Sequence, residues 1–321
     1  MCHYLSHPIM MQLEITEKCP FNCPQCYNKV SPISMNLHEI AKHVEQAHSL
    51  GVKKVILNGG EPLLHENIIE IFKIILKLNM NVAFYTSGYG LTSEILDVVK
   101  SNPKIEMYIS LNGSTEKING YSRQGFSTAI ASLEFCKKEN VPCGIVWVAR
   151  SDNVDDFPDL YHFVELQNVH SLLIIPNRPS RNNEITSALT KSDYEFLARA
   201  IKRFEKGKVH IRIDACFGLL SAYLNYKAAI FTGCYAGRYS YSVDVRGRYR
   251  PCTHMQRTEC FNSSKDYWDE SILLQNIRKS FNKIELCNMC IRKNKCSPCP
   301  LMTNSMVAGQ RCVLFEKKNI V

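Results

Sequence analysis

The sequence has no run of about 18 consecutive apolar residues, so a helix that spans a membrane is not expected. Its beginning, Met1 to Pro8, lacks the positive-then-apolar pattern of a secretion signal. No run of basic residues longer than two stands out. We therefore expect a cytoplasmic protein that binds neither membrane nor nucleic acid, although its formal net charge is +9.

Cysteine, in contrast, is abundant, with 15 residues in a chain of 321. Without a secretion signal, such thiols are expected to stay reduced and to bind metal rather than form disulfides. Cys19, Cys23 and Cys26 form a C-x3-C-x2-C run directly after the alternating segment 11–16. No His or fourth Cys follows nearby, which disfavours structural zinc, because that site takes four protein ligands. Three thiols can instead hold three irons of a [4Fe–4S] cluster and leave one iron open to a small molecule.

This cysteine run, followed by the aromatic Tyr27, resembles the signature of the radical S-adenosylmethionine (radical SAM) enzymes. The resemblance implies that the open iron chelates the amino and carboxylate groups of SAM. It also implies that the reduced cluster splits SAM to give a 5′-deoxyadenosyl radical. In the same way Tyr27 is expected near the adenine, with core packing as the alternative.

Helical and strand patterns alternate after the cysteine run, which predicts parallel strands with helices outside. A Rossmann sheet is the alternative, but no G-x-G-x-x-G follows the first strand. The radical SAM resemblance implies an open partial (β/α)6 TIM-like barrel. The expected strands are 11–16, 52–58, 81–86, 105–111, 143–149, 171–175 and 209–213. The expected helices are 36–50, 66–79, 92–101, 126–140, 155–167 and 191–206.

The chemically unusual stretches follow the ends of these strands, where α/β barrels carry their active sites. Gly59, Gly60, Glu61 and Pro62 would by themselves indicate only a turn. At this position they resemble the radical SAM motif whose Glu and backbone hold the SAM amino group. Glycine permits a close backbone approach, and a carboxylate suits an ammonium group.

Four further residues are candidates for binding SAM by the same resemblance. Ser87 stands where the family often supplies a polar contact to the methionine part or the ribose, and a turn serine is the alternative. Ser110 and Asn112 belong to S-L-N-G, which resembles the family's S-L-D-G strand end but lacks its charge. Arg123 matches the arginine that pairs with the SAM carboxylate through two parallel hydrogen bonds, with an ordinary surface arginine as the alternative.

From about residue 214 the alternation stops, so we predict a barrel over 1–213 and a second domain over 214–321. The cysteines of the second part resemble the SPASM extension of radical SAM enzymes, which carries auxiliary [4Fe–4S] clusters. The spacing departs from that pattern once, because two residues instead of three separate Cys296 from Cys299. A zinc ribbon is the alternative, but it leaves several of these thiols without a role. The seven cysteines are Cys234, Cys252, Cys287, Cys290, Cys296, Cys299 and Cys312.

The resemblance implies that Cys234, Cys252 and Cys299 hold the first auxiliary cluster and that the other four hold the second. Two clusters of this kind need eight ligands, so the first has an open iron or borrows another residue. Cys216 and Cys260 are the nearest remaining thiols.

Cys216 follows the last expected strand of the barrel and is a candidate ligand, hydrogen-atom donor or buried thiol. Asp214 beside it is a candidate base, with a helix cap as the alternative. We take both as candidate catalytic residues.

These parts predict a peptide maturase that uses SAM and three [4Fe–4S] clusters. It would abstract a hydrogen atom from a ribosomally synthesised precursor peptide, leading to a crosslink, an epimerisation or another oxidation. Only ten residues precede the first expected strand, so no fused leader-binding domain is expected there. Either a separate protein brings the leader, or the substrate binds to the barrel and the SPASM part alone. A flavodoxin- or ferredoxin-type electron donor is also expected.

The alternative enzymes are an anaerobic sulfatase-maturating (formylglycine-forming) enzyme and a small-molecule dehydrogenase. A non-catalytic iron–sulfur electron carrier is the alternative from another class. The turn at 59–62 and Arg123 argue against it, because an electron carrier has no need to bind SAM.

Overall fold

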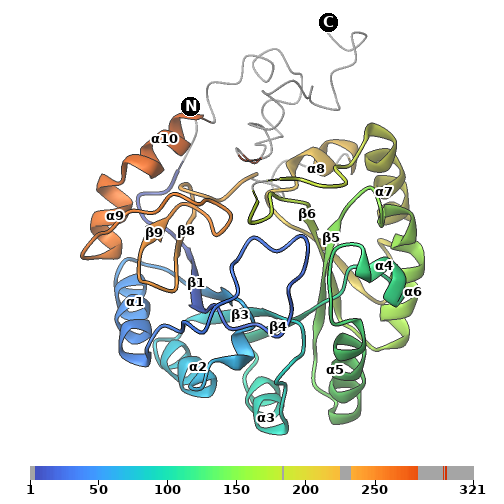
Figure 1. The fold of residues 1–321 in the computed structure, drawn as a ribbon, viewed down its shortest axis with the longest axis horizontal. Helices are drawn as coiled ribbons and strands as arrows, with labels where there is room; N and C mark the ends of the chain where they lie inside the picture. The colour runs from blue at the N-terminus through green and yellow to red at the C-terminus, as the bar shows by residue number, and fades with distance from the viewer. Residues whose placement is uncertain (1–3, 183, 225–232, 281–298, 300, 302–321) are drawn as a thin grey trace, which may run out of the picture.

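The computed structural model describes residues 4–182, 184–224, 233–280, 299 and 301. Within them the strands form one sheet, in the order β7-β6-β5-β4-β3-β2-β1-β8-β9. Strands β1 to β7 pair in parallel and curve into an open barrel (Figure 1). The strands are β1 (Met10–Thr16), β2 (Lys54–Gly59), β3 (Asn81–Thr86), β4 (Ile105–Ser110), β5 (Gly144–Ala149), β6 (Ser171–Pro176), β7 (His210–Ile213), β8 (Ser240–Val243) and β9 (Tyr249–Arg250).

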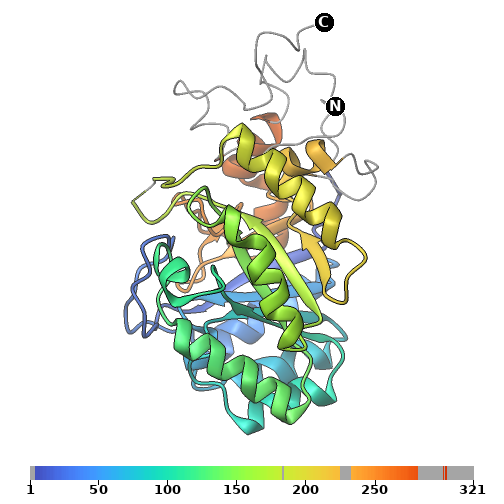
Figure 2. The same ribbon diagram turned by 90° about the vertical axis from the view of Figure 1, so that its right-hand side faces the viewer.

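The helices lie on the outer face of the sheet, and the expected partial α/β barrel is confirmed. In Figure 2 the green to yellow helices α5, α6 and α7 cover the strands of the second half of the sheet. The six long helices expected from the sequence are all present, whereas the shorter α4, α8 and α9 were not predicted. The helices are α1 (Leu37–Ser49), α2 (Ile68–Lys77), α3 (Ser93–Ser101), α4 (Glu116–Gly120), α5 (Phe126–Glu139), α6 (Phe157–Leu166), α7 (Lys191–Phe204), α8 (Gly218–Leu224), α9 (Ser264–Glu270) and α10 (Ile272–Ser280), with the 3₁₀ turns η1 (Pro62–Leu64) and η2 (Val154–Asp156).

The first long helix shows how local sequence sets these boundaries. Asn36 caps α1, since its side chain accepts a hydrogen bond of 2.9 Å from the Glu39 amide. Gly51 follows the helix with a φ of +101°, a conformation that L side chains rarely adopt. Both ends of α1 thus follow from the residues at its boundaries.

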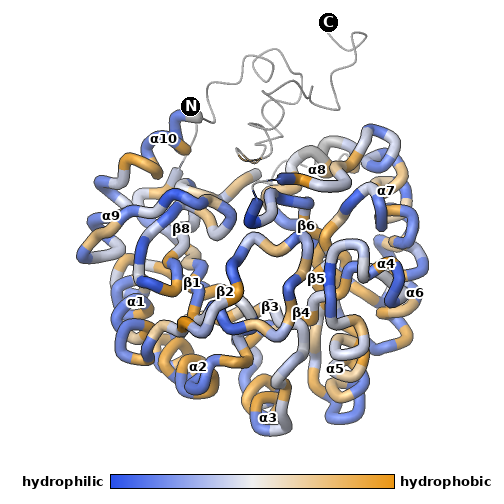
Figure 3. The backbone as a smooth tube through the Cα atoms, viewed as in Figure 1, coloured by the Kyte–Doolittle hydropathy of each residue, from blue (hydrophilic) through white to orange (hydrophobic). Residues whose placement is uncertain are grey.

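Successive side chains of a strand point to opposite faces of the sheet. Met11, Leu13 and Ile15 of β1 are fully buried in the core beneath the helices. The helices are amphipathic, and most show both hydrophilic and hydrophobic segments in Figure 3. No helix among the described residues is long and apolar enough to cross a membrane.

Side chains fill the barrel toward the amino ends of its strands. Tyr108 belongs to a small apolar cluster on the inner face of the sheet, and its hydroxyl accepts from Arg212. Glu106 bridges strands by accepting from Lys54 at 2.5 Å and from Arg212 at 3.1 Å. This packing leaves the carboxyl ends of the strands as the place for chemistry.

The sheet continues past the predicted domain boundary at residue 213. Strand β8 pairs in parallel with β1, from Met10 opposite Ser240 to Leu13 opposite Val243. Strand β9 then pairs antiparallel with β8. The start of the cysteine-rich part is therefore hydrogen-bonded to the first barrel strand.

We expect Trp147→Ala to lower the free energy of unfolding by about 3–5 kcal/mol, because it empties a large, fully buried site. The variant also removes the indole donor to the Asn112 carbonyl. Urea denaturation measures the change. Leu166→Ala is the control, since Leu166 is 75 % exposed and a surface change costs within about 0.5 kcal/mol. Equal losses in both variants would contradict the placement of Trp147.

Candidate active site at the carboxyl ends of the strands

The three cysteines of the C-x3-C-x2-C run lie on one loop directly after β1. Cys23 is buried, and Cys19 and Cys26 are partly buried. The Cys26 amide donates to the Cys23 carbonyl at 3.1 Å, which closes a turn inside the run. The amide of Gln124 donates to the Cys23 sulfur at 3.4 Å, so a second loop supports the first.

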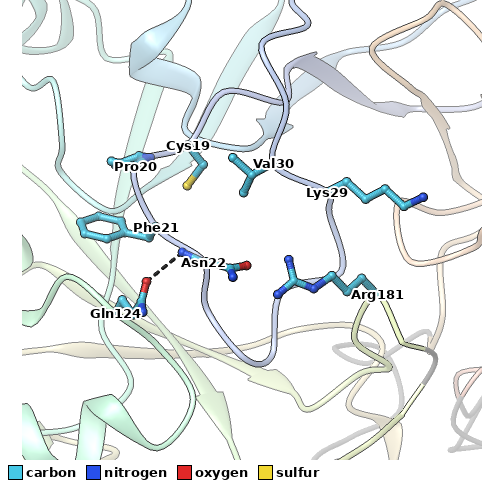
Figure 4. Close-up of a pocket in the computed structure, with 8 residues that line it drawn as sticks. All are labelled: Cys19, Pro20, Phe21, Asn22, Lys29, Val30, Gln124 and Arg181. Atoms are coloured by element: carbon cyan, nitrogen blue, oxygen red, sulfur yellow. Dashed lines mark hydrogen bonds between the residues drawn. The ribbon is translucent and has the colours of Figure 1, made fainter.

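A pocket of about 640 Å³ opens beside Cys19. Figure 4 shows the Cys19 thiol and the Arg181 guanidinium directed toward the same space. This volume suits a cofactor-sized ligand, and the pocket offers both a sulfur ligand and cationic groups to it. It is lined by Cys19, Pro20, Phe21, Asn22, Lys29, Val30, Gln124 and Arg181.

The glycine-rich turn after β2 is bonded to the start of the cysteine loop. The Gly60 amide donates to the Thr16 carbonyl, and the Glu61 amide donates to the Lys18 carbonyl, both at 2.7 Å. A Cβ atom at Gly60 would lie 2.3 Å from the Lys18 carbonyl oxygen, which no side chain can tolerate. Gly59 has a φ of +133°, which also favours glycine. The two glycines thus permit the contact that holds the cysteine loop in place.

Glu61 is buried, and donors of the chain itself surround its carboxylate. It accepts hydrogen bonds from the Thr86 hydroxyl at 2.6 Å and from the Leu63 amide at 3.2 Å. Ser87 donates from both its amide and its hydroxyl, at 2.7 and 2.5 Å. Burial raises the pKa of Glu61, although these four bonds favour the ionised form. Glu61 and Ser87 therefore join the ends of β2 and β3, while their contact with SAM stays a prediction.

Asn112, buried after β4, organises the loop that carries Arg123. Its amide group donates to the Ser122 hydroxyl at 2.9 Å, and its side-chain oxygen accepts from the Val148 amide at 3.1 Å. Asn119 extends this network by donating to the Arg123 carbonyl at 3.0 Å. The uncharged Asn112 can make both of its bonds, because an amide side chain both donates and accepts hydrogen bonds.

The structure brings Arg123 close to the cysteine loop. Arg123 and Arg181 both lie near enough to Cys26 to act on its ionisation, although burial is the largest effect and raises the pKa of that thiol. Ser110 lies buried at the end of β4. The predicted SAM contacts of Arg123, Asn112 and Ser110 remain predictions.

Sequence analysis did not identify Arg181. Its amide donates to the Cys26 carbonyl at 2.9 Å, and its side chain lines the pocket. Arg181 lies in a loop rich in turn-forming residues after β6, and no motif marks it there. The contact depends on how the barrel brings that loop to the first one.

Tyr27 connects the cysteine loop to the strand β9 region. Its ring lies 4.5 Å from that of His254, and its hydroxyl hydrogen-bonds to Glu14. Glu14 is 3 % exposed and forms an ion pair with Arg250 of β9. Burial nevertheless raises the pKa of Glu14 to about 7. The predicted contact of Tyr27 with adenine stays a prediction.

A second group of thiols gathers beside the end of β7. Cys299 accepts hydrogen bonds from Cys216 and Cys234, which hold the pKa of Cys299 well below its usual range. Cys216 and Cys252 both pack against the cluster that contains Cys234. Cys260 is exposed. Four of the predicted ligands lie outside the described residues, namely Cys287, Cys290, Cys296 and Cys312.

Asp214 lies next to these thiols. Its side chain accepts a hydrogen bond within a turn and forms an ion pair. One oxygen accepts from the Cys216 amide at 2.7 Å and from the Arg178 guanidinium at 2.8 Å. Burial raises the pKa of Asp214 to about 6, in spite of that guanidinium. A role for Asp214 as a base stays a prediction.

We tested whether these residues fit iron–sulfur clusters. No three of the Cys, His, Asp and Glu side chains that the structure describes are placed to hold one metal ion. The donor chemistry nevertheless suits iron, since each group consists of thiols. Burial raises the pKa of Cys19 to about 11, so its thiolate needs a positive partner such as iron.

Comparison with known proteins gives one family match, the Radical SAM superfamily, over residues 13–164. A PqqA peptide cyclase of Ruegeria pomeroyi is 29% identical over 157 residues, which span 46% of this chain and 42% of that protein. A PqqA peptide cyclase of Rhizobium meliloti is 24% identical over 305 residues, or 89% and 80% of the two chains. An AdoMet-dependent heme synthase of Methanosarcina barkeri is 22% identical, over 91% of each.

Solved structures show the same fold. Streptococcus suis SuiB bound to precursor peptide SuiA has a TM-score of 0.79 at 16% identity, covering 94% of this chain and 74% of that one. The anSMEcpe structure with bound AdoMet and the Cp18Cys peptide has a TM-score of 0.72 at 18% identity, covering 90% and 88%.

We expect the stability of the protein to fall as pH rises from about 4.5 toward 7, in part because of Glu14. Its folded-state pKa lies above the unfolded value, so the folded state binds the extra proton and loses that advantage as the pH passes 7. Urea denaturation from pH 4.5 to 8 measures this slope.

Glu14→Gln, which keeps the shape and stays neutral, should make the slope shallower. Glu66→Gln is the matched control, since Glu66 is exposed. Identical slopes in wild type and Glu14→Gln would contradict the raised pKa.

Proposed function

Because the chain contains a radical SAM domain, we propose that the protein is a radical SAM peptide maturase that takes a hydrogen atom from a ribosomally synthesised precursor peptide. The observation that carries the proposal is the contact between the cysteine loop and the glycine turn of β2, beside a pocket of about 640 Å³. Relatives named as PqqA peptide cyclases support a peptide substrate. The likeness in fold to a SuiB structure with its precursor peptide is compatible with it.

Cys19, Cys23 and Cys26 would hold a [4Fe–4S] cluster, and Arg123 would hold the SAM carboxylate. When bound, this cluster supplies the electron that splits SAM and so makes an attack on an unactivated carbon possible. The chain's own part is to hold the ligands and the substrate. Two guanidiniums, those of Arg123 and Arg181, lie near Cys26 and suit an anionic carboxylate there. The turn at Gly60 fixes the loop against movement.

The thiol contacts beside β7 support a four-cysteine site for one auxiliary cluster. Its ligands would be Cys216, Cys234, Cys252 and Cys299, which gives every iron a thiolate. Of the roles that the sequence leaves open for Cys216, these contacts favour the ligand. The second auxiliary cluster, on Cys287, Cys290, Cys296 and Cys312, is proposed from spacing alone. We further propose a cytoplasmic location, a flavodoxin- or ferredoxin-type electron donor and a separate leader-binding protein.

Iron and sulfide analysis of anaerobically reconstituted protein tests the clusters. We expect about twelve irons in wild type and about eight in a Cys19/Cys23/Cys26→Ala variant, with Mössbauer spectra of [4Fe–4S] clusters in both. Cys136→Ala is the control, because Cys136 lies in the hydrophobic core beneath the helices. About four irons in wild type and none in the triple variant would mean that the protein binds no auxiliary cluster, and would contradict that part of the proposal.

Removal of the Arg123 charge should weaken SAM binding by about tenfold to a hundredfold, because a charged hydrogen bond contributes about 1.5–3 kcal/mol. Equilibrium binding of SAM to the reconstituted protein measures the effect for Arg123→Gln. Lys117→Gln removes an exposed charge from the neighbouring helix α4 and should leave the affinity unchanged. Unaltered affinity in Arg123→Gln would rule out its predicted role.

A precursor peptide provides the test of substrate class. Reduced wild-type protein should form 5′-deoxyadenosine. A candidate precursor should lose mass where hydrogen is removed, or keep its mass and change configuration at one residue where it is epimerised. A sulfatase-derived peptide serves as the competing substrate. Modification of that peptide alone would favour the sulfatase-maturating alternative, and a failure to form any 5′-deoxyadenosine would favour the electron carrier.

A further inference from the structure

Arg178 is a largely buried cation that no motif accounts for. It follows the end of β6 by two residues, and its side chain is only 12% exposed. One guanidinium nitrogen donates to Asp214 at 2.8 Å. The Nε atom is buried and has no hydrogen-bond partner among the described residues. A buried guanidinium N–H without an acceptor costs free energy, so this donor indicates an acceptor that the protein chain does not supply.

The thiols beside β7 surround this guanidinium. Arg178 interacts electrostatically with Cys216, Cys252 and Cys299. An arginine guanidinium is not deprotonated in proteins, so a fixed positive charge lies beside these thiols.

One other described cation, Arg250, acts on these thiols, namely on Cys252, and its Nε also lacks a hydrogen-bond partner among the described residues. Arg250 is paired with Glu14. Arg178 acts on three of the four thiols and Arg250 on one, so removal of Arg178 changes the charge around the thiols most widely.

We propose that Arg178 is a positioning residue of the four-cysteine site, which donates its Nε–H to a sulfur of the bound auxiliary cluster and raises the reduction potential of that cluster. This inference rests on the proposed assignment of Cys216, Cys234, Cys252 and Cys299 as cluster ligands. Reduction adds one electron and hence one negative charge to the cluster. A buried cation and a hydrogen bond to sulfur stabilise that added charge more than they stabilise the oxidised form. An auxiliary cluster with a raised potential accepts an electron more readily, as net oxidation of a substrate requires.

Asp214 makes the charge effect testable in both directions. It lies beside the same thiols and carries the opposite charge, with the Cys216 amide on one of its oxygens. Arg178→Gln removes the cation and leaves Asp214 unpaired, so the potential should fall. Asp214→Asn keeps an acceptor for the Cys216 amide and removes the anion, so the potential should rise.

The experiment is a potentiometric titration followed by EPR, on the full-length chain with Cys19/Cys23/Cys26→Ala, in which only auxiliary clusters remain. The signal of the four-cysteine site is the one that Cys234→Ala removes. Iron content is measured for each variant, and Arg257→Gln is the control, because Arg257 is exposed. We expect full iron content, a lower potential in Arg178→Gln, a higher one in Asp214→Asn and no shift in Arg257→Gln.

The outcomes separate this inference from the proposed function. An unchanged potential in Arg178→Gln with full iron content would overturn the role of Arg178 and leave the cluster assignment standing. No iron in the parent variant would instead overturn the auxiliary clusters themselves. Where Arg178→Gln binds less iron, Asp214→Asn decides, and an unchanged or lower potential in that variant would overturn the inference.

Discussion

The backbone contact between the glycine turn and the cysteine loop is the constraint on which the candidate site depends. Two amide hydrogen bonds of 2.7 Å, from Gly60 and Glu61, fix the first carbonyls of the loop that carries the three cysteines. These bonds form only because Gly59 and Gly60 lack a Cβ atom, which would collide with the carbonyl oxygens of Thr16 and Lys18. Glu61 then extends the contact to β3 through Thr86 and Ser87. The barrel strands and the candidate SAM pocket are thus joined through one short turn.

Much of the fold follows from local patterns, and the sequence is sufficient for that part. Strands that are buried on both faces, separated by amphipathic helices, predict a parallel barrel. The short helices α4, α8 and α9 escape prediction because five to seven residues carry too little periodicity. The pairing of β8 with β1 escapes it for another reason. It joins segments more than 200 residues apart, and nothing in either one specifies the partner.

The candidate site likewise has one part that the sequence predicts and another part that it does not. The cysteine run and the glycine turn are contiguous in sequence, so their spacing predicts them directly. Arg178, Arg181 and the Glu14–Arg250 pair depend on tertiary contacts, and an isolated arginine in a loop gives no signal. Cys216 lies between these cases. Its position marks it in the sequence, but its contacts with Cys234 and Cys299 exist only in the folded chain.

Strand β1 is an interior strand of the sheet, with β2 on one side and β8 on the other. A fragment that stops at residue 213 would therefore lose β8 and present one unpaired backbone edge of β1 to solvent. Exposed edges of this kind recruit other strands and lead to aggregation. Strand β8 thus protects the edge of the strand that precedes the first cysteine loop, so the barrel depends on the later part of the chain to stay free of aggregation.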